Sequence, residues 1–299
     1  MPRQEHGHGE LPVRTSIHAS VWGPHWDSAG IDATLEAAAR LGYDHVVVPL
    51  RATADLDPAA LAGAFERHGL VPLNTAGVPA HSDIGSSDHA TRLRGIQHLK
   101  TALRVARDMG SPQINGVLYG PLTRASQQAP EGAFERAADS IAMVAEDAGR
   151  MGLRLALEVV NRYETNLLNT AGRALEFLEK VGLDNVGLHL DTFHMSIEER
   201  NPEQALRSGM SRLFYLELDQ SHRGALQDGS LDLGALTRYA AQLGYRGIVG
   251  VEAFSRSRMT ADHADALAIW RDVYDSPEAL AAGAIALIRG AFAATGDAR

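Results

Sequence analysis

Short apolar runs alternate along the chain with longer segments of helical spacing. Eight runs are rich in Val, Ile and Leu, and each precedes a segment in which apolar residues recur every three or four positions. This alternation is typical of βα units, which build a parallel sheet. The runs predict strands at 16–19, 45–49, 70–75, 113–118, 154–160, 186–191, 213–219 and 247–254. The segments between and after them predict helices at 28–41, 58–68, 88–109, 131–151, 171–181, 202–207, 232–243 and 261–292.

Glycines recur at the ends of the predicted helices. The joints read LGY at 41–43, HGL at 68–70, MGL at 151–153, VGL at 181–183 and LGY at 243–245. A glycine just past a helix adopts the left-handed conformation without a Cβ clash, and the apolar residue after it begins the return to the sheet. The recurrence indicates one structural unit repeated along the chain.

The number of βα units decides the fold class. Eight units with no linker-like stretch between them favour a closed (β/α)₈ TIM barrel, because closure removes both edges of the sheet. We therefore predict an α/β protein with a single barrel domain at 13–295, after a flexible polar leader at 1–12. The alternative is a doubly wound open sheet. Its nucleotide-binding form needs a glycine-rich turn after the first strand, but residues 20–26 read SVWGPHW and contain no GxGxxG.

Composition and charge narrow the class of protein. The chain has 28 Lys and Arg against 37 Asp and Glu, a net charge of −9 that disfavours nucleic acid as a partner. It has no cysteine, which excludes disulfides, thiolate metal sites and a Cys nucleophile. No stretch reaches the roughly 18 to 20 unbroken apolar residues of a membrane span, and the leader lacks the apolar core of a signal peptide. We expect a cytoplasmic protein that binds neither nucleic acid nor membrane.

Acidic residues stand near the ends of four consecutive predicted strands, the fifth to the eighth. They are Glu158, Asp191, Glu217 and Glu252, each flanked by apolar residues. A single carboxylate in such a place is commonly the N-cap of the next helix. In a barrel, however, active sites form at the C-terminal ends of the strands, so these carboxylates would meet. Buried like charges are costly unless a proton or a cation compensates them.

An oxygen-rich cluster of this kind indicates a site for a divalent cation. Mn²⁺ or Mg²⁺, with Co²⁺ as a further candidate, suits carboxylate oxygens better than zinc, which proteins hold through nitrogen and sulfur. The alternative is a hydrogen-bonded network of protonated carboxylates that holds no metal.

Four motifs carry a resemblance to a known family. They are LEVVNRYETNLLNT at 157–170, GLHLDTFHMSIEE at 187–199, SHRG at 221–224 and VEAFS at 251–255. The chain resembles the ketose 3-epimerases, a group that includes the D-tagatose, D-allulose and L-ribulose 3-epimerases of the xylose-isomerase-like barrel superfamily. The resemblance extends, more weakly, from about residue 17 to residue 288. It implies the same barrel fold and a homodimer or homotetramer.

The resemblance also implies a metal site. Glu158 and Glu252 match two family glutamates that bind the metal and act as the acid/base pair, and Asp191 matches a third ligand. At the fourth ligand position the family has a histidine, whereas this chain has Glu217. The family's Gly-Glu just before SHRG is Asp-Gln here, at 219–220. We therefore expect a ligand set of four carboxylates.

A sugar-binding shell is implied as well. His194 and Arg223 match residues that contact the ketose near its carbonyl, and Glu164 matches a glutamate that supports this shell. From the sequence alone, His18 and Trp22 follow the first strand and are candidates for lining the sugar pocket, Trp22 by stacking on a sugar face. Ordinary packing explains these two residues equally well.

These groups fit the inversion of C3 in a free keto-sugar. A divalent cation bound to the C2 carbonyl and the C3 hydroxyl makes the C3 proton more acidic by stabilising an enediolate. One of Glu158 and Glu252 then takes the proton, and the other returns one from the opposite face. Arg223 would hold charge that develops on the oxygen, and His194 would orient that oxygen.

Three other functions remain open at this point. A sugar-phosphate epimerase or isomerase would use Arg256 and Arg258, because barrel phosphate sites often lie in the loops after the seventh and eighth strands. A lyase-type enzyme acting on a 3-keto-glycoside would use the same metal and base. A sugar-binding protein that has lost its metal site is the non-enzymatic alternative.

Overall fold

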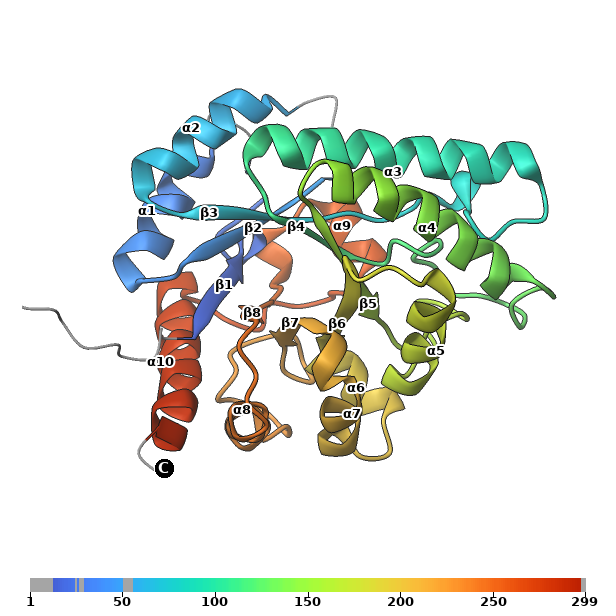
Figure 1. The fold of residues 1–299 in the computed structure, drawn as a ribbon. Helices are drawn as coiled ribbons and strands as arrows, with labels where there is room; N and C mark the ends of the chain where they lie inside the picture. The colour runs from blue at the N-terminus through green and yellow to red at the C-terminus, as the bar shows by residue number, and fades with distance from the viewer. Residues whose placement is uncertain (1–12, 25, 27–29, 51–55, 297–299) are drawn as a thin grey trace, which may run out of the picture.

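Eight parallel strands close into one barrel in the computed structural model, which confirms the predicted fold class (Figure 1). The structure describes residues 13–24, 26, 30–50 and 56–296, so the predicted leader at 1–12 lies outside the described residues. Each strand pairs with the next along the chain, and β8 pairs with β1 to complete the ring. The strands are β1 (Arg14–His18), β2 (His45–Pro49), β3 (Val71–Thr75), β4 (Gln113–Gly116), β5 (Arg154–Val159), β6 (Val186–Asp191), β7 (Leu213–Leu218) and β8 (Ile248–Val251).

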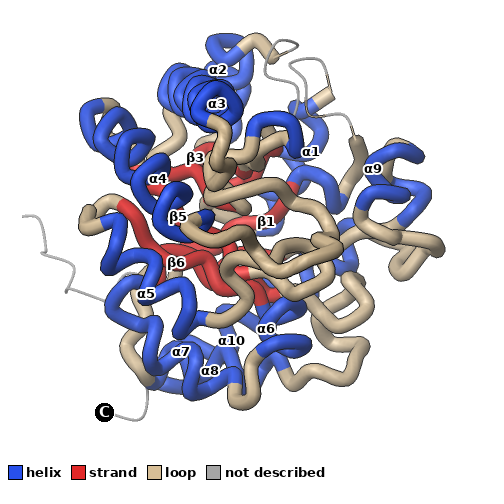
Figure 2. The backbone as a smooth tube through the Cα atoms, turned by 90° about the vertical axis from the view of Figure 1, so that its right-hand side faces the viewer, coloured by secondary structure: helices blue, strands red, loops and turns tan. Residues whose placement is uncertain are grey.

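Helices surround the strands as an outer layer (Figure 2). Neighbouring helices contact one another around the ring, and α10 closes it by packing against both α8 and α1. The main hydrophobic core lies between these helices and the outer faces of the strands. The helices are α1 (Ile31–Leu41), α2 (Pro58–His68), α3 (His89–Met109), α4 (Ala133–Arg150), α5 (Ala171–Val181), α6 (Thr192–Glu198), α7 (Pro202–Gly209), α8 (Leu233–Gln242), α9 (Ala261–Ala266) and α10 (Pro277–Gly296).

The backbone confirms the predicted glycine stops. All five glycines have a left-handed φ between 66° and 87°: Gly42, Gly69, Gly152, Gly182 and Gly244. At the end of α1, for example, the Gly42 N–H donates to the carbonyls of Ala38 and Ala39. A residue with a Cβ would be strained in this conformation, so the glycines end the helices where the chain turns back to the sheet.

Two details of the helix prediction are wrong. The helix expected at 261–292 is in fact two helices, α9 and α10, because Ser276 and Pro277 start a new one. Ser276 Oγ accepts a hydrogen bond from the Ala279 N–H at 3.1 Å, and proline is favoured in the first turn. The short helix α6 was not expected; it begins because Asp191 Oδ1 accepts the Phe193 N–H at 2.6 Å.

Inside the barrel, an apolar floor supports the polar end. Side chains from five strands form this small buried cluster: Val47, Leu73, Ala156, Tyr215 and Ile248. Because side chains alternate along a strand, residues two positions further on also face the interior. Glu158 follows Ala156 in this way, and Glu217 follows Tyr215. These two carboxylates therefore lie directly above an apolar layer.

Helix α10 is the one described helix that is long and apolar enough to cross a membrane, judged by length and composition alone. Its buried side chains include Leu280, Ala284, Ile285 and Ile288, which belong to the hydrophobic core of the barrel. Core helices of barrels satisfy the same criterion, so the apolar character of α10 is accounted for by its packing on α8 and α1.

Gly250 makes room for the Tyr215 side chain within the barrel. A Cβ at Gly250 would lie 1.9 Å from Tyr215 Oη and 2.3 Å from Cζ. Tyr215 is completely buried, and its hydroxyl lies 2.7 Å from Ser16 Oγ and donates to Glu217 Oε1 at 3.1 Å. These contacts leave the ring no free space to move into.

We expect Gly250→Ala to lower the free energy of unfolding by about 3 kcal/mol or more, because overpacking forces the ring or the strand to shift. Chemical denaturation at neutral pH measures the change. Gly172→Ala in α5 is the matched control, since a Cβ there meets nothing within 4 Å. It should change the stability by less than about 1 kcal/mol. Equal effects of the two substitutions would show that the Tyr215 contact is not a constraint.

Candidate active site

A cavity of about 800 Å³ opens at the C-terminal ends of the strands. The wall combines apolar side chains such as Val78 and Phe254 with a polar group. The polar part of the wall includes seven of the residues predicted from the sequence: His18, Glu158, Glu164, His194, Glu217, Arg223 and Glu252. Asp191 is completely buried beside them. Trp22 is absent from the described lining and packs half-buried against the core, so the structure favours the packing explanation for this residue.

His194 and Glu158 form one side of the site. His194 Nδ1 accepts hydrogen bonds from the backbone N–H of Asn161 at 3.2 Å and from its side-chain amide at 2.8 Å. The ring proton is therefore on Nε2, which lies 3.4 Å from Glu158 Oε1. Burial lowers the pKa of His194, so the ring is neutral and can donate one hydrogen bond into the cavity. Glu164 Oε1 accepts from the same Asn161 amide at 3.2 Å.

The two carboxylate oxygens of Asp191 have different surroundings. Oδ1 accepts the N–H groups of Phe193 and His194 at 2.6 and 3.4 Å, which is the helix-capping role common at a strand end. Oδ2 is buried, has no hydrogen-bond partner among the described residues, and lies 4.0 Å from Arg223 Nη1. Burial raises the pKa of Asp191 to about 7, although His194 and Arg223 oppose the shift. The capping and the site-forming roles therefore coexist in this residue.

Arg223 supplies positive charge on the opposite side of the site. Its Nη1 lies 2.7 Å from Asp219 Oδ2, and its Nη2 donates to Glu252 Oε2 at 2.9 Å. The guanidinium also lies over the rings of Phe193 and Phe254, 4.4 and 4.8 Å from their centroids. The backbone of Arg223 has a left-handed φ of 62°, an uncommon conformation for a residue with a Cβ. The loop thus holds the guanidinium against buried carboxylates despite local strain.

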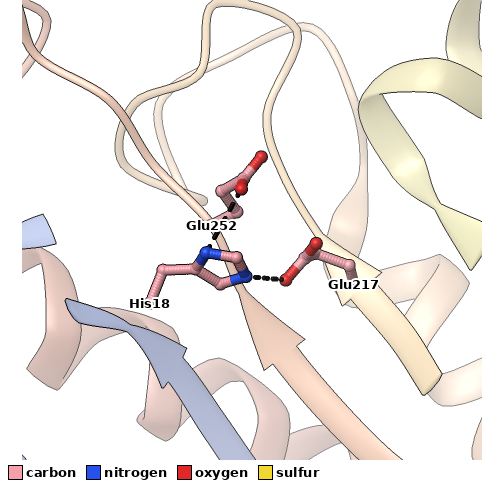
Figure 3. Close-up of side chains that lie close together, drawn as sticks. All are labelled: His18, Glu217 and Glu252. Atoms are coloured by element: carbon pink, nitrogen blue, oxygen red, sulfur yellow. Dashed lines mark ion pairs between the residues drawn. The ribbon is translucent and has the colours of Figure 1, made fainter. Parts of the chain in front are cut away.

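Glu217 lies lower in the barrel, between two imidazoles. Oε1 is 2.9 Å from His18 Nε2, and Oε2 is 3.0 Å from His189 Nε2. Figure 3 shows His18 between Glu217 and Glu252, with its Nδ1 3.3 Å from Glu252 Oε1. Burial opposes a charged His18, but Glu217 and Glu252 outweigh it and raise its pKa to about 9. Burial likewise opposes a charged Glu217, but His18 and His189 lower its pKa.

Two buried residues of the site were not among the predicted site residues. His189 is completely buried within β6, and Asp219 is completely buried just after β7. The signal for both was the two-residue period of a strand: His189 precedes Asp191 by two positions, and Asp219 follows Glu217 by two. The sequence alone does not show which inward residues reach one another across the barrel.

Comparison with known proteins identifies the family of this chain. Residues 35–281 match the family described as xylose isomerase-like TIM barrel. A ketose 3-epimerase of Arthrobacter globiformis is 34% identical over 277 residues, which cover 93% of this chain and 96% of that protein. An L-ribulose 3-epimerase of Mesorhizobium japonicum is 34% identical over 276 residues, covering 92% and 93%. The chain belongs to the ketose 3-epimerase family. Its members are isomerases of the carbohydrate epimerase class.

The fold is shared with this family throughout. The crystal structure of a D-allulose 3-epimerase from Methylomonas sp. in complex with D-allulose superimposes with a TM-score of 0.89 at 31% identity. The match covers 93% of this chain and 97% of the other. The predicted family and the predicted barrel are therefore both confirmed.

The donor atoms of the site could hold a metal ion. Four groups of three described residues each offer ligand atoms within 4.8 Å of one another. Glu217 belongs to two of them, each with a histidine: His18, Glu217 and Glu252, and Glu158, His189 and Glu217. The other two groups are Glu158, Asp191 and His194, and the all-carboxylate group Asp191, Asp219 and Glu252. Asp191 Oδ2 and both carboxylate oxygens of Asp219 are buried and have no hydrogen bond among the described residues. Asp219 Oδ2 has an ion pair with Arg223, whereas Asp219 Oδ1 and Asp191 Oδ2 have no hydrogen-bond donor among the described residues. Buried oxygens of this kind are the ligands that a hard divalent cation prefers. The side chains present therefore fit such a cation.

The two arginines considered for a phosphate face other groups. Arg256 Nη1 donates to Asp265 Oδ1 at 2.8 Å and to the Ile269 carbonyl at 2.9 Å. Arg258 donates to the Asp275 carbonyl at 3.2 Å. Neither arginine is among the residues that line the cavity.

The titration of the site predicts a pH-dependent stability. Burial raises the pKa of Glu252 to about 7, above the value near 4.5 in an unfolded chain. The folded state therefore binds this proton more tightly, and the stabilisation is present at low pH and is lost as the pH rises through 7. Asp191 and His18, with pKa values raised to about 7 and about 9, act in the same direction.

In the chelator-treated protein we expect Glu252 to contribute about 2 kcal/mol less stability at pH 8.5 than at pH 5.5, while the lowered pKa values of buried His45 and His194 act in the opposite direction. Denaturant titrations at both pH values measure it. Glu252→Gln should reduce the difference, whereas Glu278→Gln, an exposed glutamate of α10, should leave it unchanged. The same pH dependence in the wild type and in Glu252→Gln would contradict the assignment.

Proposed function

We propose that this protein is a metal-dependent ketose 3-epimerase that inverts C3 of a free keto-sugar. The observation that carries the proposal is the placement of two glutamates, Glu158 and Glu252, in the wall of one cavity. They come from β5 and just after β8, three strands apart around the ring, so they approach a bound sugar from different sides. Burial raises the pKa of both carboxyl groups, which suits acid/base work near neutral pH.

The chemistry follows from the two carboxyl groups. One glutamate, ionised, takes the proton from C3, and the other, protonated, returns a proton to the opposite face of the same carbon. The configuration at C3 inverts without a redox cofactor. Which of Glu158 and Glu252 acts first depends on the configuration of the substrate.

Two donors support the reacting oxygens. The Nε2–H of neutral His194 points towards Glu158 and can donate to a sugar oxygen held beside that glutamate. The Arg223 guanidinium lies against Glu252 and can hold negative charge that develops on the oxygen near the other glutamate. Glu164 and His18 lie in the same wall, where they can accept or donate hydrogen bonds to sugar hydroxyls.

A divalent cation belongs to the proposal. Glu158, Asp191 and Glu252, with a carboxylate from β7, would hold Mn²⁺ or Mg²⁺, with Co²⁺ as a further candidate; the sequence predicts Glu217 for the fourth place. When bound, the cation makes the C3 proton more acidic by polarising the neighbouring oxygens.

The free sugar is the preferred substrate class. A related 3-epimerase was crystallised with D-allulose, which carries no phosphate. Here Arg256 and Arg258 are engaged with protein groups away from the cavity. The proposal also includes a cytoplasmic location and assembly as a homodimer or homotetramer. Light scattering after size-exclusion chromatography measures the mass of the assembly.

We expect Glu158→Gln and Glu252→Gln each to reduce kcat by about 10²- to 10⁴-fold with the fold intact, because each removes a proton-transfer group at nearly constant volume. The assay uses D-allulose, D-tagatose, D-fructose and L-ribulose with Mn²⁺, Mg²⁺ or Co²⁺. Glu278→Gln, with an exposed side chain in α10, is the control and should turn over normally. A loss of less than tenfold from either site variant would defeat the two-glutamate mechanism.

The same reaction in D₂O should place one deuterium at C3 of the product, since the returned proton comes from a group that exchanges with solvent. Product analysis by NMR shows the position of the label. A product without solvent-derived label would indicate a hydride shift. Faster turnover of the matching ketose phosphates than of the free sugars would overturn the substrate class.

A further inference from the structure

Strand β7 brings two inward carboxylates to the site, and their surroundings differ. Glu217 and Asp219 are two residues apart and therefore face the same side of the strand. The family resemblance places the fourth metal ligand at 217, where it implies a histidine. The contacts of the two carboxylates decide which of them is free to take that role.

Both oxygens of Glu217 are already engaged by neighbouring side chains. Oε1 lies 2.9 Å from His18 Nε2 and accepts a hydrogen bond from the Tyr215 hydroxyl at 3.1 Å. Oε2 lies 3.0 Å from His189 Nε2. The side chain is only 1% exposed. Coordination of a cation by Glu217 would require it to give up contacts with His18, His189 or Tyr215.

The same imidazoles reach the two proposed acid/base residues. His18 Nδ1 lies 3.3 Å from Glu252 Oε1, and His189 Nδ1 lies 3.9 Å from Glu158 Oε2. Glu217 therefore stands at the centre of a buried chain of contacts that begins at one glutamate and ends at the other. This arrangement fixes the positions of both imidazoles beneath the site.

Asp219, unlike Glu217, has a carboxylate oxygen with no partner in the described part of the chain. It is completely buried, and neither carboxylate oxygen has a hydrogen bond among the described residues. Its Oδ2 has an ion pair with Arg223 at 2.7 Å, and Oδ1 has no hydrogen-bond partner among the described residues. Asp219 offers a ligand atom within 4.8 Å of those of Asp191 and Glu252, and Asp191 Oδ2 is also without a hydrogen bond. Unpartnered oxygens of two buried side chains thus face the same place.

We propose that Asp219, and not Glu217, supplies the fourth carboxylate for the divalent cation, while Glu217 positions His18 and His189 beneath Glu252 and Glu158. The inference rests on the cation of the proposed function and assigns its ligands differently. The fourth ligand then lies two residues beyond Glu217, just past the end of β7, and Glu217 is a buried anchor for two histidines.

Metal binding by matched variants tests the assignment. Chelator-treated wild type, Asp219→Asn and Glu217→Gln are titrated calorimetrically with Mn²⁺ and with Co²⁺, and the visible absorption of the Co²⁺ protein is recorded. Both substitutions remove one charge at nearly constant volume. Loss of an outer partner typically weakens a metal site about 10- to 100-fold, and a lost ligand weakens it more. We therefore expect Asp219→Asn to reduce the affinity more than about 100-fold and Glu217→Gln to reduce it by less.

Control variants distinguish the loss of a metal ligand from a loss of folding. Asp228→Asn changes an exposed aspartate in the same loop and should bind both cations like the wild type. Asp219→Gly introduces the family residue at this position and also removes the carboxylate, so it should lose affinity to the same extent. It replaces Asp219→Asn in the comparison if the asparagine variant folds poorly. Glu217→His should not tighten Co²⁺ binding, whereas an imidazole at a true ligand position would.

Kinetic measurements distinguish a positioning role of Glu217 from a purely structural one. With a ketose that the wild type converts, Glu217→Gln should lower kcat about 10- to 100-fold while KM and the Mn²⁺ affinity change little. Unchanged cation affinity in Asp219→Asn and Asp219→Gly, with a large loss in Glu217→Gln, would overturn the inference and leave the proposed function standing. A wild type that binds neither cation would overturn the metal site of the proposed function together with this assignment.

Discussion

Mutual repulsion among buried carboxylates is the constraint on which the rest of the site depends. Four neighbouring strands end with acidic residues, and closure of the barrel brings them to one place. Separate cationic side chains compensate the negative charges at two levels along the barrel axis. Arg223 lies against Asp219 and Glu252 near the mouth, and His18 and His189 lie against Glu217 below. Without these partners the charges could not remain buried.

The scaffold around Arg223 shows how this compensation is enforced. The guanidinium packs between two aromatic rings, which fixes its plane, and the backbone of Arg223 accepts a left-handed φ of 62°. Strain of this kind persists where surrounding contacts overdetermine a conformation, and such places are often functional sites. The apolar floor beneath the site adds to the effect, because it excludes water and makes every charge interaction above it stronger.

The chain has the barrel of its family, and the family resemblance implies one difference in the charge of its site. About one third of the residues are identical to those of the compared 3-epimerases, and the match extends over more than nine tenths of the chain. The strands and helices therefore tolerate wide substitution, as expected when function depends on side chains at strand ends and in loops. Glu217 adds a negative charge where the family resemblance implies an imidazole, and imidazoles of β1 and β6 lie beside that charge.

The sequence by itself determined the eight βα units, the glycine stops and the acidic strand ends, because each depends on local spacing along one segment. It also indicated Glu158, Asp191, Glu217 and Glu252 as residues of one site, since parallel strands end at the same edge. Only the tertiary structure decided which inward residues touch. The pairing of β6 with β7 has an irregularity between Leu188 and His189, which sets His189 opposite Tyr215 and Asp191 opposite Glu217. Such a register depends on contacts between distant segments, and no local pattern records it.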